Sequence, residues 1–284
     1  MGSETANDVP QPEPPRGGDL VRRHRLSTRL WHWVNAFTVF VMLMSGLMIF
    51  NAHPRLYWGE YGANSDQPWL QIGATGGGRG IVNLAGHKII TTGVLGVWKD
   101  SHGVERRKAF PYWATIPSSY SLADARIWHF FFAWVLVIGG LGYWLVSFYN
   151  RHVQRDLLPT RDEIAPRHIW QDIRNHARLR FPTGIAATRY NILQKMAYLS
   201  VLFGLLPLMV LTGLTMSPGI NAAWPWLLDV FGGRQSARLI HFLCAFGLLL
   251  FIVVHLVMVV LAGPFNEVRS MITGRYRLPK ERGE

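Results

Sequence analysis

Two histidines, His241 and His255, stand fourteen residues apart in the apolar stretch 239–263 near the end of the chain. A helix turns by about 100° per residue, so fourteen residues complete almost four turns and both imidazoles leave the same helix face. At a rise of about 1.5 Å per residue, the two rings lie roughly 21 Å apart along the axis. The hydrocarbon core of a bilayer is about 30 Å thick, which places one imidazole toward each leaflet. Imidazole is a common metal ligand, and this spacing leaves room for two haem groups in one bundle.

Four segments of the chain are each at least 18 residues long and contain no Asp, Glu, Lys or Arg. They account for the hydrophobic content of 49%. Segments of this length and composition are typical of helices that span a bilayer. We therefore predict an all-α membrane protein, a bundle of four transmembrane helices with a long outer loop, with spans at residues 33–50, 128–146, 196–216 and 239–263.

The chain has a formal net charge of +12, and its arginines cluster in three regions: before the first span, between the second and third spans, and after the fourth. The positive-inside rule places these regions and both termini in the cytoplasm, and the loops 51–125 and 217–237 outside. This distribution favours a membrane topology over nucleic-acid binding as the reason for the charge. We expect a multi-pass membrane protein, with the lipid bilayer and no nucleic acid among its partners.

The two ends of the chain are predicted to lie outside the bundle. Pro10, Pro12, Pro14 and Pro15 stand among Glu, Asp and Gly, a composition that buries too little surface to fold. We predict a disordered cytoplasmic tail at 1–28, a single domain at 29–263 and a second cytoplasmic tail at 264–284. The first apolar run follows an arginine cluster, is of spanning length and lacks a convincing cleavage site, so we expect it to be a membrane anchor and not a signal peptide.

Two further histidines lie at the ends of spans. His32 opens the first span and His129 opens the second. With the amino terminus inside, His129 lies level with His241 near the outer face, and His32 lies level with His255 near the inner face. Polar groups at membrane depth are costly and usually have functional partners, and bis-histidine ligation needs two of them at equal depth. The sequence therefore predicts two opposing pairs.

Three of these histidines follow an arginine by three residues: Arg29 precedes His32, Arg126 precedes His129, and Arg238 precedes His241. Residues three apart on a helix share one side, so each guanidinium lies nearer the water on the same side as its imidazole. Haem propionates are anions that point toward the interface, where paired hydrogen bonds from a guanidinium can neutralise them. Arginines at span ends also extend toward water without any ligand. No arginine precedes His255 in this way. Arg189 or Lys195, near the start of the third span, is the candidate propionate partner on that side.

The single cysteine, Cys244, lies inside the fourth span. One cysteine excludes an intramolecular disulfide and any multi-cysteine iron–sulfur or zinc site on this chain. We expect a buried packing residue.

Four stretches of sequence carry a family resemblance: RLWHWVNA at 29–36, HPRLYWG at 53–59, RIWHFFFAW at 126–134, and the span from His241 to His255. On these residues the chain resembles the dihaem cytochrome b subunits of nickel–iron hydrogenases, formate dehydrogenases and thiosulfate reductases, the bacterial cytochrome b561 group. The resemblance implies two haem b groups, bound by His32 with His255 on the cytoplasmic side and by His129 with His241 on the periplasmic side. It also implies an electron-transfer subunit of the bacterial inner membrane, without catalytic residues of its own, between a periplasmic oxidoreductase and the quinone pool.

The outer loop of 75 residues departs from these relatives. Its stretch GATGGGRG at 73–80 lacks the Lys-Ser/Thr ending of a phosphate loop and follows no clear strand, which favours a flexible turn over a nucleotide site. With the aromatic segment 110–113, the loop is interpreted as a docking surface for a periplasmic redox subunit, of molybdopterin or hydrogenase type. Between the second and third spans, residues 166–181 fit either a short amphipathic helix on the inner leaflet or a solvated loop.

Two other functions are considered beside this one. A self-sufficient quinol oxidase of the cytochrome b561 type would pass electrons to a small acceptor without a dedicated partner. A divalent-metal transporter would use intramembrane histidines, but it predicts acidic residues within the spans and there are none. Quinone exchange is expected near the inner haem, with candidates chosen by depth alone: Asn35, Asn191, Gln194 and Lys195.

Overall fold

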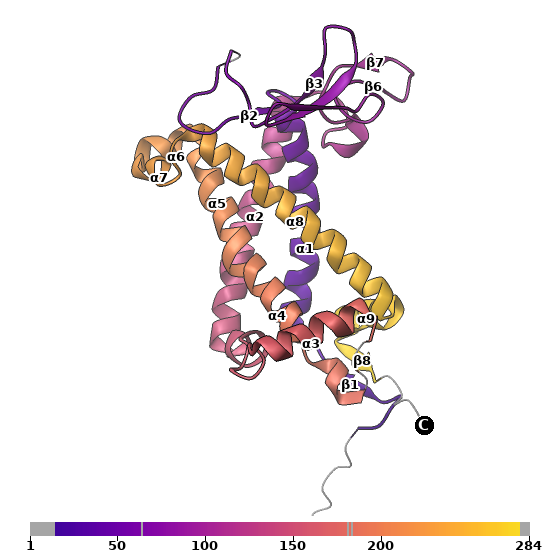
Figure 1. Cartoon of the computed structure of the whole chain (residues 1–284). Helices are drawn as coiled ribbons and strands as arrows, with labels where there is room; N and C mark the ends of the chain where they lie inside the picture. The colour runs from indigo at the N-terminus through magenta and orange to yellow at the C-terminus, as the bar shows by residue number, and fades with distance from the viewer. Residues whose placement is uncertain (1–14, 64, 181, 183, 279–284) are drawn as a thin grey trace, which may run out of the picture.

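The protein is described by a computed structural model that covers residues 15–63, 65–180, 182 and 184–278. Four helical stretches in it are long and apolar enough to cross a membrane. Three are single helices, α1 (Leu26–Phe50), α2 (Leu122–Tyr149) and α8 (Arg234–Ala262). The third in chain order is built from α4 (Ile192–Leu199), the π-helix η4 (Ser200–Leu205) and α5 (Leu206–Thr215). The predicted four-helix membrane bundle is confirmed (Figure 1).

The helices extend further toward their amino ends than the predicted spans do. At the start of α2, the Ser121 side chain accepts a hydrogen bond from the backbone of Asp124. At the start of α4, Asn191 and Gln194 form a capping box, each side chain bonding to the other's backbone. Polar residues that the hydropathy pattern leaves outside the spans therefore belong to the helices, because they satisfy the first backbone N–H groups.

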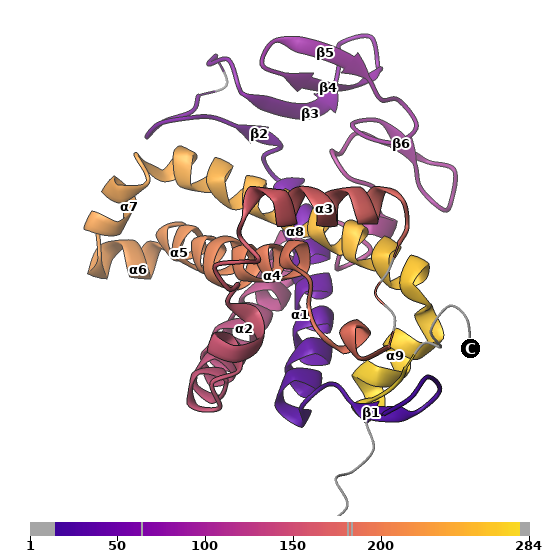
Figure 2. The same ribbon diagram turned by 60° about the horizontal axis from the view of Figure 1, so that its bottom comes forward.

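The bundle packs as two helix pairs, α1 along α2 and α5 along α8 (Figure 2). Its buried core draws on all four spans and lies midway along them; its members are Val41, Met42, Phe132, Leu136, Leu206, Met209, Cys244 and Leu248. Cys244 is buried and free, as expected of a packing residue.

Beyond the end of α1, the predicted loop 51–125 is folded, and this end of the molecule is called the sheet end below (Figure 1). An antiparallel sheet has the order β2 (Arg55–Leu56), β3 (Leu70–Ala74), β4 (Gly80–Leu84), β5 (His87–Ile90). A hairpin of β6 (Trp98–Lys99) and β7 (Glu105–Arg106) and the short helix η1 (Tyr112–Ala114) follow.

The prediction that the glycine-rich stretch 73–80 follows no clear strand is wrong. The stretch begins in strand β3 and ends in β4, so residues 75–79 are the turn of a β-hairpin. Two glycines make the sheet possible: a Cβ at Gly80 would lie 2.3 Å from the Leu95 carbonyl oxygen, and one at Gly96 would lie 2.2 Å from that of Gly73. Close backbone approach explains these glycines without a nucleotide.

The opposite end holds the first and last described residues and is called the terminal end. Strand β1 (Leu20–Arg22) pairs antiparallel with β8 (Arg275–Arg277), which follows helix α9 (Pro264–Thr273). The prediction of a disordered tail over 1–28 is therefore wrong for its second half, where β1 forms and α1 begins at Leu26. Residues 1–14 and 279–284 lie outside the described residues. An ion pair of 2.8 Å between Arg23 and Glu267 ties the two ends together.

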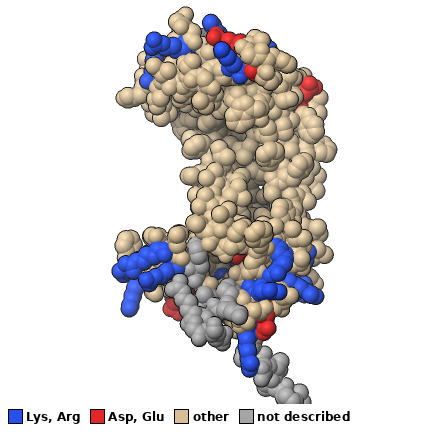
Figure 3. Space-filling view, turned by 90° about the vertical axis from the view of Figure 1, so that its right-hand side faces the viewer, with Lys and Arg blue, Asp and Glu red and all other residues tan. Residues whose placement is uncertain are grey.

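Helix α3 (Pro166–Ala177) decides between the two alternatives for residues 166–181 in favour of a helix. It runs across the bundle at the terminal end, with the π-helix η2 (Val153–Leu157) before it and η3 (Gly184–Thr188) after it (Figures 1 and 2). At the sheet end, α6 (Pro218–Ala223) and α7 (Trp226–Val230) connect α5 to α8. Lys, Arg, Asp and Glu gather at the two ends of the face drawn in Figure 3, and the band between them carries none. Such a band matches the hydrocarbon layer of a bilayer.

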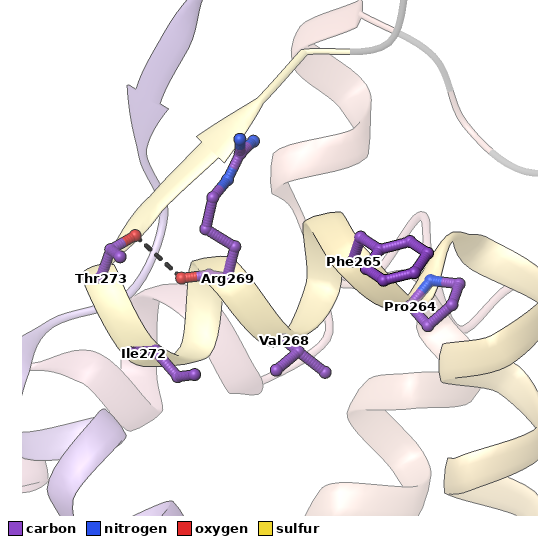
Figure 4. A pocket seen from close by; sticks show the side chains of 6 residues that line it. All are labelled: Pro264, Phe265, Val268, Arg269, Ile272 and Thr273. Carbon is purple, nitrogen blue, oxygen red and sulfur yellow. Dashed lines mark hydrogen bonds between the residues drawn. The ribbon is translucent and has the colours of Figure 1, made fainter.

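A shallow surface hollow runs along α9 (Figure 4). Phe265, Val268 and Ile272 are exposed along it, while the Arg269 side chain projects away from Val268 and Ile272. An apolar face on a short helix that directly follows a span is typical of a helix lying in the membrane interface. The histidines do not line this hollow.

Candidate functional site

The structure brings together both predicted histidine pairs. Toward the sheet end, the rings of His129 on α2 and His241 on α8 have centres 6.3 Å apart. Toward the terminal end, the rings of His32 on α1 and His255 on α8 have centres 6.1 Å apart. Helix α8 therefore contributes one imidazole to each pair.

Both ring separations fit coordination of one metal ion from opposite sides. With metal–nitrogen bonds of about 2 Å, two such imidazoles hold their ring centres roughly 6 Å apart. Two aromatic rings in edge contact fall in the same range, so the separation alone does not distinguish the two arrangements. The hydrogen bonds of the sheet-end rings indicate which nitrogen of each ring is free to bind a metal.

The ring of His129 is fixed by helix α1. Its Nδ1 lies 3.1 Å from the hydroxyl of Ser45, which is fully buried. That hydroxyl donates its own proton to the backbone carbonyl of Val41, at 2.8 Å. Ser45 must therefore accept from the ring, and Nδ1 carries the proton. Nε2 is left with an unshared electron pair, the form in which imidazole binds a metal.

The ring of His241 is fixed in the same way by helix α5. Its Nδ1 lies 3.1 Å from the hydroxyl of Thr212 and 3.1 Å from the carbonyl oxygen of Met209. The Thr212 hydroxyl donates to the Leu208 carbonyl at 2.7 Å, and a carbonyl only accepts. Nδ1 of His241 therefore also carries the proton. Partners of this kind set the tautomer and orientation of metal-binding histidines.

A glycine follows each of these hydroxyl residues, and both glycines lie against the rings. A Cβ at Gly46 would lie 3.5 Å from Cε1 of His129, and one at Gly213 would lie 3.4 Å from Cε1 of His241. The same hydroxyl–glycine pair thus supports each sheet-end imidazole. By contrast, a Cβ at Gly139 would lie 2.7 Å from the Trp31 indole, so Gly139 makes room for that side chain.

The terminal-end pair has aromatic surroundings. Phe251, one turn before His255, stacks on its ring at 5.8 Å and 14°. Trp33 lies tilted against His32, with ring centres 5.1 Å apart. One turn beyond His32, the side-chain oxygen of Asn35 is buried and has no hydrogen-bond partner among the described residues. This oxygen is therefore available to accept a hydrogen bond from a bound group.

The three arginines lie near their histidines in sequence but have partners of their own. Arg29 donates to the carbonyl of Ile272. Arg238 donates to the carbonyls of His53 and Arg55. Arg126 is exposed, with its guanidinium 5.6 Å from the Phe130 ring. Two of the three thus fasten a span to the polar segment beside it, and propionate binding stays a prediction.

A bare metal ion would lack ligands at these sites. The described residues hold no group of three or more His, Cys, Asp and Glu able to bind a metal ion. Structural zinc takes four ligands, and catalytic zinc takes three from the protein. A haem needs only the two axial positions from the protein, because its own ring nitrogens supply the other four ligands. The two imidazoles of each pair fit that need.

A bundle of four membrane-spanning helices with two opposed histidine pairs at different depths defines a membrane haem protein of the cytochrome b class. The chain belongs to the prokaryotic cytochrome b561 family, which it matches over residues 23–274. It is therefore a multi-pass membrane cytochrome that binds haem b and takes part in electron transport.

One relative shares part of the chain. Over 140 residues, which make up 49% of this chain and 67% of the relative, the sequence is 29% identical to the putative protein-methionine-sulfoxide reductase subunit YedZ1 of Azospira oryzae. No solved structure matches the chain.

Sequence reasoning missed Ser45 and Thr212. Both are hydroxyl residues followed by glycine within an apolar span, a repeated signal visible in the sequence. What the pattern lacks is the rotation of each helix, which decides whether the hydroxyl faces an imidazole or lipid. That rotation is set by packing between helices.

Proposed function

We propose that this chain is a dihaem b-type cytochrome that carries electrons between a periplasmic redox subunit and the quinone pool. The observation that carries the proposal is the pairing of His129 with His241 and of His32 with His255 at two depths on α8. Fourteen residues separate the two histidines of α8, or roughly 21 Å along its axis. One pair then serves each side of the membrane.

Each pair would hold one haem b, which accepts and returns a single electron. The chain's own residues supply position and insulation. Ser45 and Thr212 hold the sheet-end imidazoles, and the apolar core around Met42, Cys244 and Leu248 fills the space between the pairs. That core keeps water and ions away from the centres, and the surroundings of a haem help to set its potential.

We assign the terminal end to the cytoplasm and the sheet end to the periplasm. Basic residues crowd the terminal end, on β1, on α3 and its flanks, and on β8. Helices α3 and α9 both lie at this end, and a basic helix with exposed apolar residues suits an anionic inner leaflet. In α3 the exposed apolar residues are Trp170 and Ile173.

The sheet end offers an electron path to a docking surface. Phe242, next to His241, contacts Phe50 with ring centres 5.0 Å apart, and Phe50 contacts Phe110 at 5.7 Å. Two hydrogen bonds between the Asn51 side chain and the Phe110 backbone fix this turn. Three residues beyond Phe110, Trp113 is 79% exposed. An exposed aromatic side chain on a fixed turn is typical of a protein interface.

The related YedZ1 is named as a subunit of a reductase, which supports a partner for this chain as well. We propose a periplasmic oxidoreductase of molybdopterin type, docked over the Phe110–Trp113 turn. Purification of the tagged chain from its own membranes in mild detergent is expected to yield a second, molybdopterin-containing subunit. Trp113→Ser should lose that subunit, whereas Trp170→Ser, an exposed tryptophan at the other end, should keep it. Recovery of the wild-type chain alone would count against a dedicated partner.

At the terminal end, three of the four quinone candidates have partners within the protein. Lys195 donates to both carboxylate oxygens of Glu163 at 2.8 Å, while Asn191 and Gln194 cap helix α4. Asn35 is different, because its side-chain oxygen is buried one turn beyond His32 and has no hydrogen-bond partner in the part of the chain that the structure describes. Its amide can donate to a quinone oxygen or accept from a quinol hydroxyl. We therefore propose Asn35 as a quinone contact.

A spectroscopic experiment tests the proposed function. The purified protein is expected to contain two haem b per chain and to show a reduced-minus-oxidised b-type spectrum. A soluble quinol such as duroquinol should reduce both haems in the absence of any other reductant. A single haem per chain, or haems that only dithionite reduces, would contradict the proposal. Rapid oxygen consumption by the isolated chain would favour the self-sufficient oxidase instead.

A further inference from the structure

The four-stranded sheet at the sheet end finishes in an open strand. Strand β5 is the last in the order β2-β3-β4-β5 and lies at the outer margin of the sheet (Figure 2). Every residue of β5, from His87 to Ile90, is exposed. One edge of β5 pairs with β4, and none of the described strands lies along the other edge. Such an edge presents backbone N–H and C=O groups with which a further strand can pair.

The register of β4 and β5 shows which backbone groups face outward. Thr91 donates its N–H to the Gly80 carbonyl at 2.8 Å, and these residues stand directly opposite when the register is continued by one position. Bonded and unbonded pairs alternate along an antiparallel ladder, so Ile89 bonds to β4 while Lys88 and Ile90 do not. The N–H and C=O groups of Lys88 and Ile90 therefore point toward the open edge. No described residue outside the sheet bonds to them through its backbone.

The side chains along this edge are apolar on both faces of the sheet. Ile89 is 59% exposed and Ile90 is 63% exposed. Neighbouring residues of a strand point to opposite faces, so one isoleucine stands on each side. Exposed apolar side chains on an open edge favour pairing with another strand, because the pairing removes them from water.

The segment after β5 joins this edge to the Phe110–Trp113 turn. Val94 lies in the segment and is largely exposed. Gly96, two residues further on, donates its N–H to the carbonyl of Ala109 at 3.1 Å. Ala109 directly precedes the turn that is proposed above as the docking surface. The open edge is thus continuous with that surface through a hydrogen-bonded segment.

The surroundings of the edge are positively charged. Residues 75–108 include six basic side chains and two acidic ones. Both acidic side chains are already paired, Asp100 with Arg106 at 2.8 Å and Glu105 with Arg107 at 3.2 Å. The other basic residues form no ion pair within the described part of the chain: Arg79, Lys88, Lys99 and Lys108. A second copy of this edge would bring like charges together, whereas a strand that carries Asp or Glu is attracted to it.

We propose that β5 pairs with an extended, acidic segment of the periplasmic redox subunit, which adds a strand to the sheet. This inference rests on the proposed function, because it describes how the partner binds. Backbone hydrogen bonds to Lys88 and Ile90 supply the pairing. Ile89 and Ile90 meet apolar side chains on the two faces, and Lys88 meets a carboxylate. The edge and the exposed Trp113 then belong to one interface.

Hydrogen exchange tests the pairing directly. The probe is the molybdopterin-containing subunit that copurifies with the chain in mild detergent, and the reference is the chain expressed without it. The amides of Lys88 and Ile90 are expected to exchange at least about tenfold more slowly in the complex, because a hydrogen-bonded amide exchanges only when the strand opens. The amide of Ile89, which bonds to β4, should exchange slowly in both samples.

Two variants at one position separate the backbone from the side chain. Ile90→Pro removes an outward N–H without touching a bond to β4, and edge strands accept proline. We expect it to weaken binding of the subunit about tenfold or more, because the ring removes a donor and fills the side on which the new strand lies. Ile90→Val keeps the N–H and a branched apolar side chain, so it should bind as wild type. Molybdopterin recovered per haem over a dilution series measures the binding.

A charge variant and two controls complete the design. Lys88→Glu should also weaken binding, and added salt should reduce its difference from wild type. All three variants should keep the wild-type haem content and the wild-type rate of reduction by duroquinol, because β5 lies outside the bundle. Slow exchange of the Ile89 amide in Ile90→Pro shows that the sheet is intact in that variant.

The outcomes separate the added strand from the function on which it rests. If Ile90→Pro binds the subunit as tightly as wild type, or if Lys88 and Ile90 exchange equally fast with and without it, the added strand is wrong and the proposed function stands. If their slow exchange follows the concentration of the chain alone, the edge pairs with a second copy and the proposal is overturned. If the wild-type chain carries no subunit, the dedicated partner and the added strand fail together.

Discussion

His255→Leu is expected to remove one of two haems and to abolish haem reduction by quinol, while the spectrum of the other haem stays unchanged. His255 and His32 face each other, and no third ligating side chain joins them among the described residues, so in the proposed arrangement loss of one leaves a single axial ligand. The sheet-end pair lies roughly 21 Å away along α8 and has its own hydrogen bonds. Haem extraction should therefore fall from two equivalents per chain to one, and duroquinol-driven reduction should fall at least about a hundredfold.

The reciprocal variant makes the assignment specific. His241→Leu should remove the sheet-end haem and leave the terminal-end haem reducible by duroquinol, but electrons should no longer reach an outer acceptor. His87→Leu changes an exposed histidine of β5 and should retain both haems. Retention of two haems in either ligand variant would contradict the pairing.

The pairing could be predicted from sequence because depth in a membrane bundle follows from simple quantities. Each helix rises by a fixed distance per residue, and alternate spans run in opposite directions. His129 and His241 both stand near the sheet-end start of their spans. His32 opens a span that starts at the terminal end, where it meets His255 near the end of α8. No knowledge of side-chain packing is needed to place these residues at matching depths.

The folded sheet end and the β1–β8 strand pair could not be predicted in this way. Strands β2, β6 and β7 are two residues long, too short to show an alternating pattern. Strand β1 finds its partner more than 250 residues later in the chain. Such pairing depends on how α1 and α9 bring the two ends together, and local sequence does not record it. The prolines at positions 10–15 predict a tail without regular structure, but they carry no information about β1, which begins at Leu20.

The arginine pattern shows the limit of spacing arguments. Arg29 and Arg238 do lie one turn before their histidines, as the sequence requires. Their guanidinium groups nevertheless donate to the backbone carbonyls of Ile272, His53 and Arg55. A buried carbonyl without a partner is costly, so a nearby guanidinium that satisfies it stabilises the fold whether or not it also meets a propionate. The spacing predicts the side of the helix on which each guanidinium lies, but it does not predict which group that guanidinium bonds.

Removal of the Ser45 or Thr212 hydroxyl is expected to weaken binding of the sheet-end haem. Ser45→Ala and Thr212→Val remove the acceptors of the Nδ1 protons of His129 and His241. Loss of such a partner usually weakens binding by about ten- to hundredfold. The backbone carbonyls of Met42 and Met209 stay within reach of the two rings, so we expect the lower part of that range, about tenfold, for each variant.

The same variants should raise the midpoint potential of the sheet-end haem and leave the other unchanged. An imidazole that no longer donates from Nδ1 is a weaker electron donor to iron, which stabilises the ferric state less. Ser45→Thr and Thr212→Ser keep the hydroxyl and should restore both affinity and potential. Thr38→Val is a matched control, because the Thr38 hydroxyl is equally buried on α1 but has no hydrogen-bond partner among the described residues. Redox titration of both haems checks the prediction, and equal shifts in Thr38→Val and Ser45→Ala would show that the hydroxyls act through packing and not through the imidazoles.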